Sequence, residues 1–198
     1  TTMAQTSTTL IATKAHVTTI TGSDISFTAT SGVNTIKSTS TVLSGAGKLA
    51  VFDLITVTGT TNNNSTFTVK SIVSTLEITV EQIVTAENSD GSTSVSLDHT
   101  GFVSDKAKGD GYYSQTDGVH TVAYQVSADF NANATIKIQG SLATTPAEDD
   151  WFDVSGTTFT ADTSTVTSSA NFTGNFVWVR SKAQSVTAGT VNSILLNN

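Results

Sequence analysis

The chain has 198 residues, a formal net charge of −7 and no cysteine, which excludes a disulfide framework and cysteine metal sites. Its nine Lys and Arg residues are spread from Lys14 to Lys182 without a run, whereas sequence-independent nucleic-acid binding needs clustered cations that neutralise phosphates. No apolar segment reaches the roughly 18–20 residues that span a bilayer. We therefore expect neither nucleic acid nor a membrane as a partner.

The composition favours strands. Roughly a third of the residues are Thr or Ser, and only one is proline. Thr is β-branched and suits exposed strand positions, so a Thr-rich chain with regularly placed valines is biased towards β-structure. No stretch shows the i, i+3, i+4, i+7 apolar stripe of an amphipathic helix. The sequence predicts an all-β protein.

Residues 1–9 form a polar N-terminal arm in this interpretation. The arm has no charged side chain and one large apolar residue, Met3, which is too little to offset the cost of ordering it. We expect the arm to contact a neighbouring protein. Its candidate contact residues are Thr1, Thr2, Met3, Ala4 and Gln5.

Residues 10–103 are predicted to form a first module, which is barrel-like and built of short strands. Its clearest part is a β-hairpin, in which residues 51–59 and 67–73 are the strands and residues 60–66 an asparagine-rich tip. Asn tolerates left-handed backbone conformations, which accounts for its use in the tip. Residues 77–80 follow as another strand.

Residues 104–118 change in character, with three glycines, several charges and almost no aliphatic side chain, and they predict a linker. Tyr112 and Tyr113 lie within it. Adjacent side chains on an extended chain face opposite ways, so at least one of these rings is expected to meet another surface. Both are candidate partner contacts.

Residues 119–198 are predicted to form a second module, an antiparallel β-sandwich. Val122, Tyr124, Val126 and Ala128 line one face of a strand, and Ala134, Ile136, Ile138 and Gly140 line one face of the next. Residues 174–196 are predicted to be two strands joined by a turn at 187–189, covered on both faces. Trp151 and Trp178 are flanked by apolar residues, and core packing is the prediction for both.

Two sets of segments resemble modules of bacteriophage particles. Residues 52–59, 62–73, 77–80 and 85–87 resemble a small β-barrel module of tailed-phage structural proteins: an apolar strand, Thr-Gly, an Asn-rich tip and Phe-Thr-Val. Residues 136–142, Trp151, residues 174–180 and residues 188–194 are similar to a β-sandwich domain of phage virion proteins, especially phages of marine bacteria. The matches cover about two thirds of the chain.

The resemblance implies a non-enzymatic structural role. It predicts a protein on the exterior of a virion, assembled in the host cytoplasm, that decorates or stabilises the capsid by binding the major capsid protein or neighbouring copies of itself as a homo-oligomer. A tail, neck or baseplate fibre component is the first alternative. A carbohydrate-binding module that attaches the particle to a host surface is the alternative from another class.

No catalytic, cofactor-binding or metal-binding residue is predicted. His16, His99 and His120 are separated along the chain and are expected to be exposed or locally hydrogen-bonded. The acidic residues near 148–153 could gather Ca²⁺, and the nearest pair of carboxylates for glycoside cleavage would lie there, but ligand spacing is lacking and a solvated turn is the better interpretation. The same holds for Asp105, Asp110 and Asp117.

Overall fold

The computed structural model describes residues 7–113, 118–130, 133–162 and 166–197. The chain is all-β, with antiparallel sheets, and within the described ranges there is no α-helix, so no helix there could cross a membrane. Among the same residues the strands do not close into a barrel. The chain divides into two compact units. His16–Phe102 form one, here called the inserted unit, and Thr1–Ala15 with Val103–Asn198 form the other, here called the terminal unit.

The inserted unit contains one row of antiparallel strands in the order β9-β6-β7-β8-β5-β4, with β3 pairing β9. The predicted hairpin is confirmed: Ile55 on β6 is opposite Phe67 on β7, and both are buried in the unit's core. The strands are β3 (Ile20–Gly22), β4 (Ser26–Thr30), β5 (Val33–Lys37), β6 (Asp53–Thr58), β7 (Thr66–Ser74), β8 (Glu77–Val80) and β9 (Val95–Val103).

The tip of this hairpin is held by side-chain hydrogen bonds, so the reason predicted for its asparagines is wrong. The left-handed backbone conformation falls on Gly59, whose φ is 83°, and not on an asparagine of the tip. The amide of buried Asn63 instead donates to the backbone oxygen of Thr85 (3.0 Å) and accepts from its N–H (2.8 Å). The Glu87 carboxylate accepts from the N–H groups of Thr61 and Asn62. Desolvation raises the pKa of Glu87, and these hydrogen bonds outweigh it, so that the pKa lies below its ordinary value.

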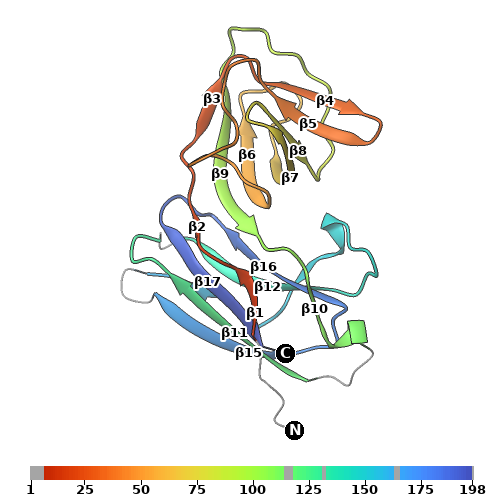
Figure 1. Cartoon of the computed structure of the whole chain (residues 1–198), viewed down its shortest axis with the longest axis vertical. Coiled ribbons are helices and arrows are strands. Elements are labelled where there is room, and N and C mark those ends of the chain that lie inside the picture. The colour runs from red at the N-terminus through yellow and green to blue at the C-terminus, as the bar shows by residue number, and fades with distance from the viewer. Residues whose placement is uncertain (1–6, 114–117, 131–132, 163–165, 198) are drawn as a thin grey trace. The chain divides into compact units, whose positions relative to one another are not determined.

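The terminal unit contains two sheets (Figure 1). In the first, the order is β1-β17-β11-β15, and β2 also pairs β17; in the second, β12 lies between β13 and β16, with β14 on β12 and β10 on β16. The strands are β1 (Thr8–Ile11), β2 (Lys14–Ala15), β10 (Ala107–Lys108), β11 (Val119–Val126), β12 (Thr135–Ser141), β13 (Phe152–Asp153), β14 (Phe159–Thr160), β15 (Thr167–Thr173), β16 (Trp178–Gln184) and β17 (Thr190–Asn197), with short 3₁₀ turns η1 (Asp110–Tyr113) and η2 (Glu148–Asp150).

The unit boundaries differ from those predicted at residues 8–15 and 104–118. β1 and β2 pair with β17, so residues 8–15 belong with the C-terminal strands. The predicted linker is part of the terminal unit: the N–H of Gly109 donates to the oxygen of Val177 and that of Gly111 to Phe176. A Cβ on Gly109 would lie 2.5 Å from the backbone oxygen of Phe176, so these glycines permit close packing.

The two strands predicted within residues 174–196 form, but they do not pair with each other. β16 is hydrogen-bonded to β12 and β10, whereas β17 is hydrogen-bonded to β11, β1 and β2. The connection between them therefore passes from one sheet to the other, with positive φ at Ser185 (58°) and Gly189 (81°). Each strand is covered by apolar side chains on one face only, because each sheet turns a single face to the core.

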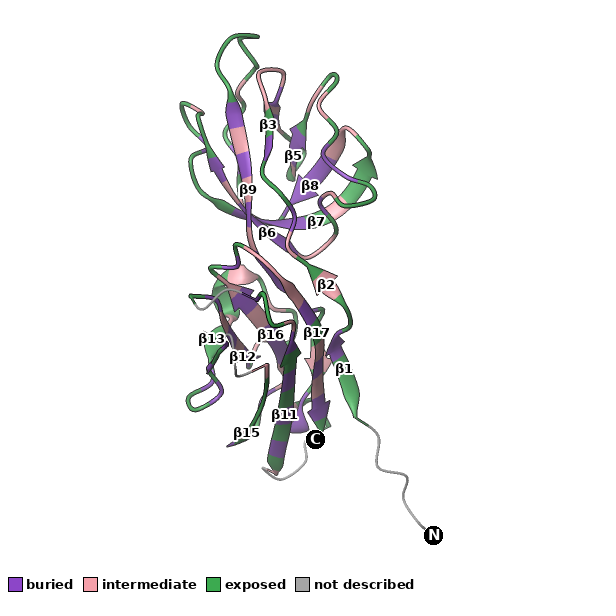
Figure 2. Cartoon of the chain, turned by 90° about the vertical axis from the view of Figure 1, so that its left-hand side faces the viewer, coloured by how far each residue is buried: buried purple, intermediate pink, exposed green. Residues whose placement is uncertain are grey.

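The two sheets meet through alternating side chains of β11, whose buried and exposed positions succeed one another in Figure 2. Val122, Tyr124 and Val126 are buried, as predicted, but Ala128, predicted on the same face, lies beyond the end of β11 and is exposed. The Tyr124 hydroxyl donates to the backbone oxygen of Thr157 (2.6 Å), and its ring stacks on Phe159 of β14, in the second sheet, with ring centroids 5.5 Å apart. Burial raises the pKa of Tyr124 far above its ordinary value, so the phenol stays protonated and donates.

The Tyr124→Phe variant is expected to lower the free energy of unfolding of the terminal unit by about 1–2 kcal/mol, because the buried Thr157 oxygen loses its donor. Urea unfolding followed by tryptophan fluorescence measures this unit alone, since Trp151 and Trp178 both belong to it. Tyr113→Phe, at a ring 57% exposed, is the matched control and should leave the unfolding midpoint unchanged. Equal effects of the two changes would contradict the role assigned to the buried hydroxyl.

Candidate binding face

The outer surface of the second sheet of the terminal unit carries a concentration of charged and aromatic side chains. On β16, Val179, Ser181 and Ala183 point to the core, so Trp178, Arg180 and Lys182 lie on the opposite face. We call this surface the charged face. It comprises Lys106, Lys108, Lys137, Gln139, Glu148, Trp151, Asp153, Trp178, Arg180 and Lys182. Five of the nine basic residues of the chain are among them.

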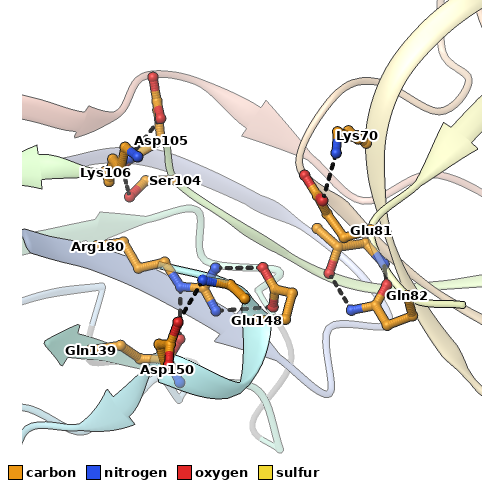
Figure 3. Close-up of polar contacts among 12 residues, drawn as sticks. Lys70, Glu81, Gln82, Ser104, Asp105, Lys106, Gln139, Glu148, Asp150 and Arg180 are labelled. Atoms are coloured by element: carbon orange, nitrogen blue, oxygen red, sulfur yellow. Dashed lines mark hydrogen bonds and ion pairs between the residues drawn. The ribbon is translucent and has the colours of Figure 1, made fainter. Parts of the chain in front are cut away.

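Arg180 is at the centre of the charged face, with every part of its guanidinium in contact. Nη1 and Nη2 donate to the two carboxylate oxygens of Glu148 (2.7 and 3.1 Å), and Nε donates to Oε1 of Gln139 (2.9 Å), as Figure 3 shows. The guanidinium carbon also lies 4.3 Å from the ring centroid of Trp151. Because the Arg180 side chain is only 6% exposed, these contacts bind η2 to the sheet rather than leaving a cation for a ligand.

The network continues along the register of β12 and β13. Gln139, whose amide oxygen accepts from Arg180, donates from Nε2 to the carboxylate of Asp153 (2.9 Å), which is also paired with Lys137. Desolvation raises the pKa of Asp153, but the bonds from Lys137 and Gln139 bring it below its ordinary value. Burial lowers the pKa of the Lys182 ammonium, and the neighbouring Arg180 lowers it further.

A surface cluster of aromatic rings and lysines adjoins this network. The Tyr112 ring centroid lies 5.2 Å from that of Tyr113 and 4.9 Å from that of Trp178. Lys106 Nζ lies 4.6 Å from the ring of Trp178, and Lys108 Nζ lies 4.2 Å from the ring of Tyr112. Tyr112 is 42% and Tyr113 57% exposed. We call these five side chains the aromatic cluster.

The predicted contact residues fall partly inside the described structure. Thr1, Thr2, Met3, Ala4 and Gln5 lie outside the described residues. Tyr112 and Tyr113 do not face opposite ways as on an extended strand, because they occupy the 3₁₀ turn η1, where both rings reach the surface and touch. Whether a partner covers them stays a prediction.

The prediction that both tryptophans pack in the core is wrong. Each is partly exposed, because β16 turns Trp178 to its outer face and Trp151 covers Arg180 there. The indole N–H of Trp178 donates to the backbone oxygen of Thr144 (3.0 Å). Next to Trp178, the apolar Val179 is the core-facing neighbour on the same strand, whereas Phe152, next to Trp151, is itself 44% exposed.

The acidic residues act locally. Glu148 and Asp153 bind cations of the charged face, and Asp150 accepts from the N–H of Ala147 at the start of η2 (2.8 Å). Asp110 accepts from the N–H of Gly118 (2.8 Å), and Asp105 accepts from the N–H of Lys106, while Asp117 lies outside the described residues. Within the ranges described, no three His, Asp or Glu side chains gather closely enough to hold a metal ion.

The histidines are more buried than predicted, and two of them come together. His99 is 2% and His120 0% exposed. In the inserted unit, Nδ1 of His16 lies 3.1 Å from Nδ1 of His99, which also accepts from the N–H of Val17. Nε2 of His99 lies 3.6 Å from the carboxylate of Asp53. No spacing in the sequence could reveal this cluster, because 83 residues separate the two histidines.

In the terminal unit, His120 lies beside Asp110, with 3.5 Å between Nε2 and Oδ2, and stacks on Phe172. His99 on β9 thus lies beside a carboxylate of β6, and His120 on β11 lies beside a carboxylate of η1. Both histidine side chains are buried, and these contacts lie within their own units.

No family of proteins matches the chain, and a search among curated proteins finds no similar sequence.

Arg180→Lys is expected to destabilise the terminal unit by about 1–3 kcal/mol, because Lys cannot reproduce the two-pronged bond to Glu148 and the bond to Gln139 together. Lys70→Met is the matched control: the Lys70–Glu81 pair, also drawn in Figure 3, has side chains 58% and 34% exposed and should change stability little. Calorimetric unfolding of both variants is the measurement. If the Arg180→Lys variant unfolded at the same temperature as the wild type, the stabilising role of this network would be contradicted.

Acidification is expected to weaken the inserted unit through His16. Burial, and then the neighbouring His99, lower the pKa of His16, so the unfolded chain binds the proton more readily than the folded one. The contribution of neutral His16 to the free energy of unfolding is therefore fully present above about pH 6.5, the ordinary pKa of histidine. It is lost as the pH drops through the lower pKa that His16 has in the folded chain. Melting temperatures measured by circular dichroism between about pH 7 and pH 5 should fall less for His16→Asn than for the wild type.

Proposed function

We propose that the protein is a non-enzymatic structural component of a bacteriophage virion that decorates or stabilises the exterior of the capsid through protein–protein contacts. The proposal combines the resemblance of the segments described above with one structural observation, the aromatic cluster. Its partners would be the major capsid protein or neighbouring copies of the chain. Its proposed place is the outer surface of the particle, reached after assembly in the host cytoplasm.

The aromatic cluster supports a protein partner because its exposed rings are held in place rather than free. Tyr112 packs against Trp178, and Gly109 and Gly111 hydrogen-bond the segment to residues 176–177. Tyr and Trp side chains ordered in this way lose little conformational entropy on binding, which is why protein interfaces are enriched in them. Lys106 and Lys108 add cations that can pair with carboxylates at the rim of such an interface.

We further propose that the terminal unit is a β-sandwich and that the inserted unit is an open, barrel-like relative of the small β-module of tailed-phage structural proteins. The contact of Tyr124 with Phe159 across the two sheets supports the first assignment. The hairpin of β6 and β7, with Gly59 and the Asn63 tip, supports the second. In this scheme the sandwich presents the aromatic cluster to the capsid.

In the double variant Tyr112→Ala/Tyr113→Ala, the Kd for attachment to capsids is expected to rise by at least tenfold, because two interface anchors worth about 1–2 kcal/mol each are removed. The assay is co-sedimentation with particles of the encoding phage from which the protein has been removed. Leu142→Ala, at an apolar side chain 65% exposed in the same unit, is the control and should attach as the wild type does. Wild-type attachment by the double variant would contradict the proposal.

A carbohydrate-binding module is the second candidate, and the partial exposure of Trp151 and Trp178 favours it. Sugars stack on free aromatic faces, but Lys106 lies over Trp178 and Arg180 over Trp151. Glycan-array binding that Trp178→Ala abolishes, with the fold intact, would favour this candidate. A tail or fibre position would instead be recognised by antibody labelling of particles in electron microscopy.

A further inference from the structure

β15 (Thr167–Thr173) is a long, regular strand at the open edge of the first sheet of the terminal unit. It pairs with β11 over its whole length, from Val119 opposite Thr173 to Gln125 opposite Thr167, without a bulge. No strand in the described part of the chain pairs with its other side. Figure 2 shows β15 beside β11 at this edge of the sheet.

The backbone of β15 presents a regular set of unused polar groups. The N–H of Val126 donates to the oxygen of Val166 (2.8 Å), and in an antiparallel ladder alternate residues bond to the same neighbour. Ser168, Ala170 and Phe172 therefore bond to β11. The residues between them turn one N–H and one C=O each to the open side; they are Thr167, Ser169, Asn171 and Thr173.

Other edges of the chain are protected in ways that β15 is not. On β4, Phe27 exchanges two backbone hydrogen bonds with Glu87 (2.8 and 3.0 Å), which covers its open side. β1 has four residues and a register shift, and β3, β10, β13 and β14 have two or three residues each. Short length, bulges, proline and charge are the usual protections of an edge strand, and β15 has none of them.

The outer surface of the same sheet is uncharged over three strands. Rows of side chains cross it according to the register, for example Leu195, Ala123 and Ser169, or Asn197, Thr121 and Asn171. The described residues on this face are Val119, Thr121, Ala123, Gln125, Thr167, Ser169, Asn171, Thr173, Ser193, Leu195 and Asn197. In a chain of net charge −7, this is a surface on which a second copy would meet no like charge.

We propose that β15 pairs antiparallel with β15 of a second copy of the chain, about a two-fold axis at Ala170. In this register Thr167 is opposite Thr173 of the second copy, and Ser169 is opposite its Asn171. All four residues with outward backbone groups then form hydrogen-bonded pairs, and the two first sheets become one continuous sheet. The pairing is self-complementary, as a two-fold interface requires. It does not rest on the proposed function.

Ser169→Pro tests the edge, because the N–H that it removes faces the open side and no hydrogen bond to β11 is lost. In sedimentation velocity the wild type is expected to be a dimer that 1 M salt does not dissociate, since the interface is uncharged. Ser169→Pro should be a monomer with unchanged circular dichroism. A monomeric wild type, or a Ser169→Pro dimer, would overturn the proposal.

Charge variants test the register and cover the case in which the proline variant fails to fold. Ser169→Lys/Asn171→Lys places like charges opposite each other and should give a monomer, whereas Ser169→Lys/Asn171→Glu places opposite charges there and should restore the dimer. Ala123→Lys adds a charge to the same face on β11, away from the edge, and should remain dimeric. A monomeric Ala123→Lys, or no difference between the two double variants, would refute pairing through β15.

Cross-linking measures the axis directly, in a chain that has no cysteine of its own. At the axis, Ala170 faces its own copy in a non-hydrogen-bonded pair, where Cα atoms are about 4.5 Å apart and a disulfide can form. Ala170→Cys should oxidise to a covalent dimer, and Ser168→Cys, which would be opposite Phe172 of the second copy, should not. Equal cross-linking of both variants, or of neither, would show that the axis is not at Ala170.

Discussion

β17 is the strand on which the terminal unit depends, because it is hydrogen-bonded along both edges. β11 occupies one edge, and β1 and β2 share the other. The first strands of the chain therefore complete the sheet that its last strand enters, and residues 16–102 are inserted between them as a unit with its own core. A strand at the centre of a sheet satisfies its backbone N–H and C=O groups only with partners on both sides. Removing β1 and β2 would leave one edge of β17 unpaired, and removing β17 would leave β1, β2 and one edge of β11 unpaired.

The outer face of the second sheet carries charged side chains that pair with one another, instead of apolar side chains. Arg180 is buried there, which is costly unless the charge is paired and hydrogen-bonded. Glu148, Gln139 and Trp151 meet that requirement together. The result is that the η2 turn, in sequence an acidic surface loop, is bound to β16 and shapes the surface next to the aromatic cluster.

The two outer surfaces of the terminal unit consequently differ in chemistry. The charged face carries ion pairs and the aromatic cluster, while the face of β17, β11 and β15 is uncharged and ends at an open edge. In the two proposals made above, the first surface would bind a different protein and the second the chain's own copy. That combination suits a component that assembles on a larger particle.

The sequence by itself determined the strand content and much of the burial pattern, since alternation along a strand is a local property. Val122 with Tyr124, Ile136 with Ile138, and Ile55 with Val57 all follow it. Which strands pair was decided only by the tertiary structure: the adjacent segments β16 and β17 looked like a hairpin, yet each found its neighbours in a different sheet.

The same limit applies to the candidate site. Tyr112 and Tyr113 were visible as aromatic residues in a polar stretch, but their contact with Trp178, the pairing of Arg180 with Glu148 and the meeting of His16 with His99 join residues far apart in the chain. The apolar flanks of Trp178 predict core packing, but alternation along a strand defines two faces without saying which one is covered. That choice depends on which segments pack against the strand, and only the folded chain brings them there.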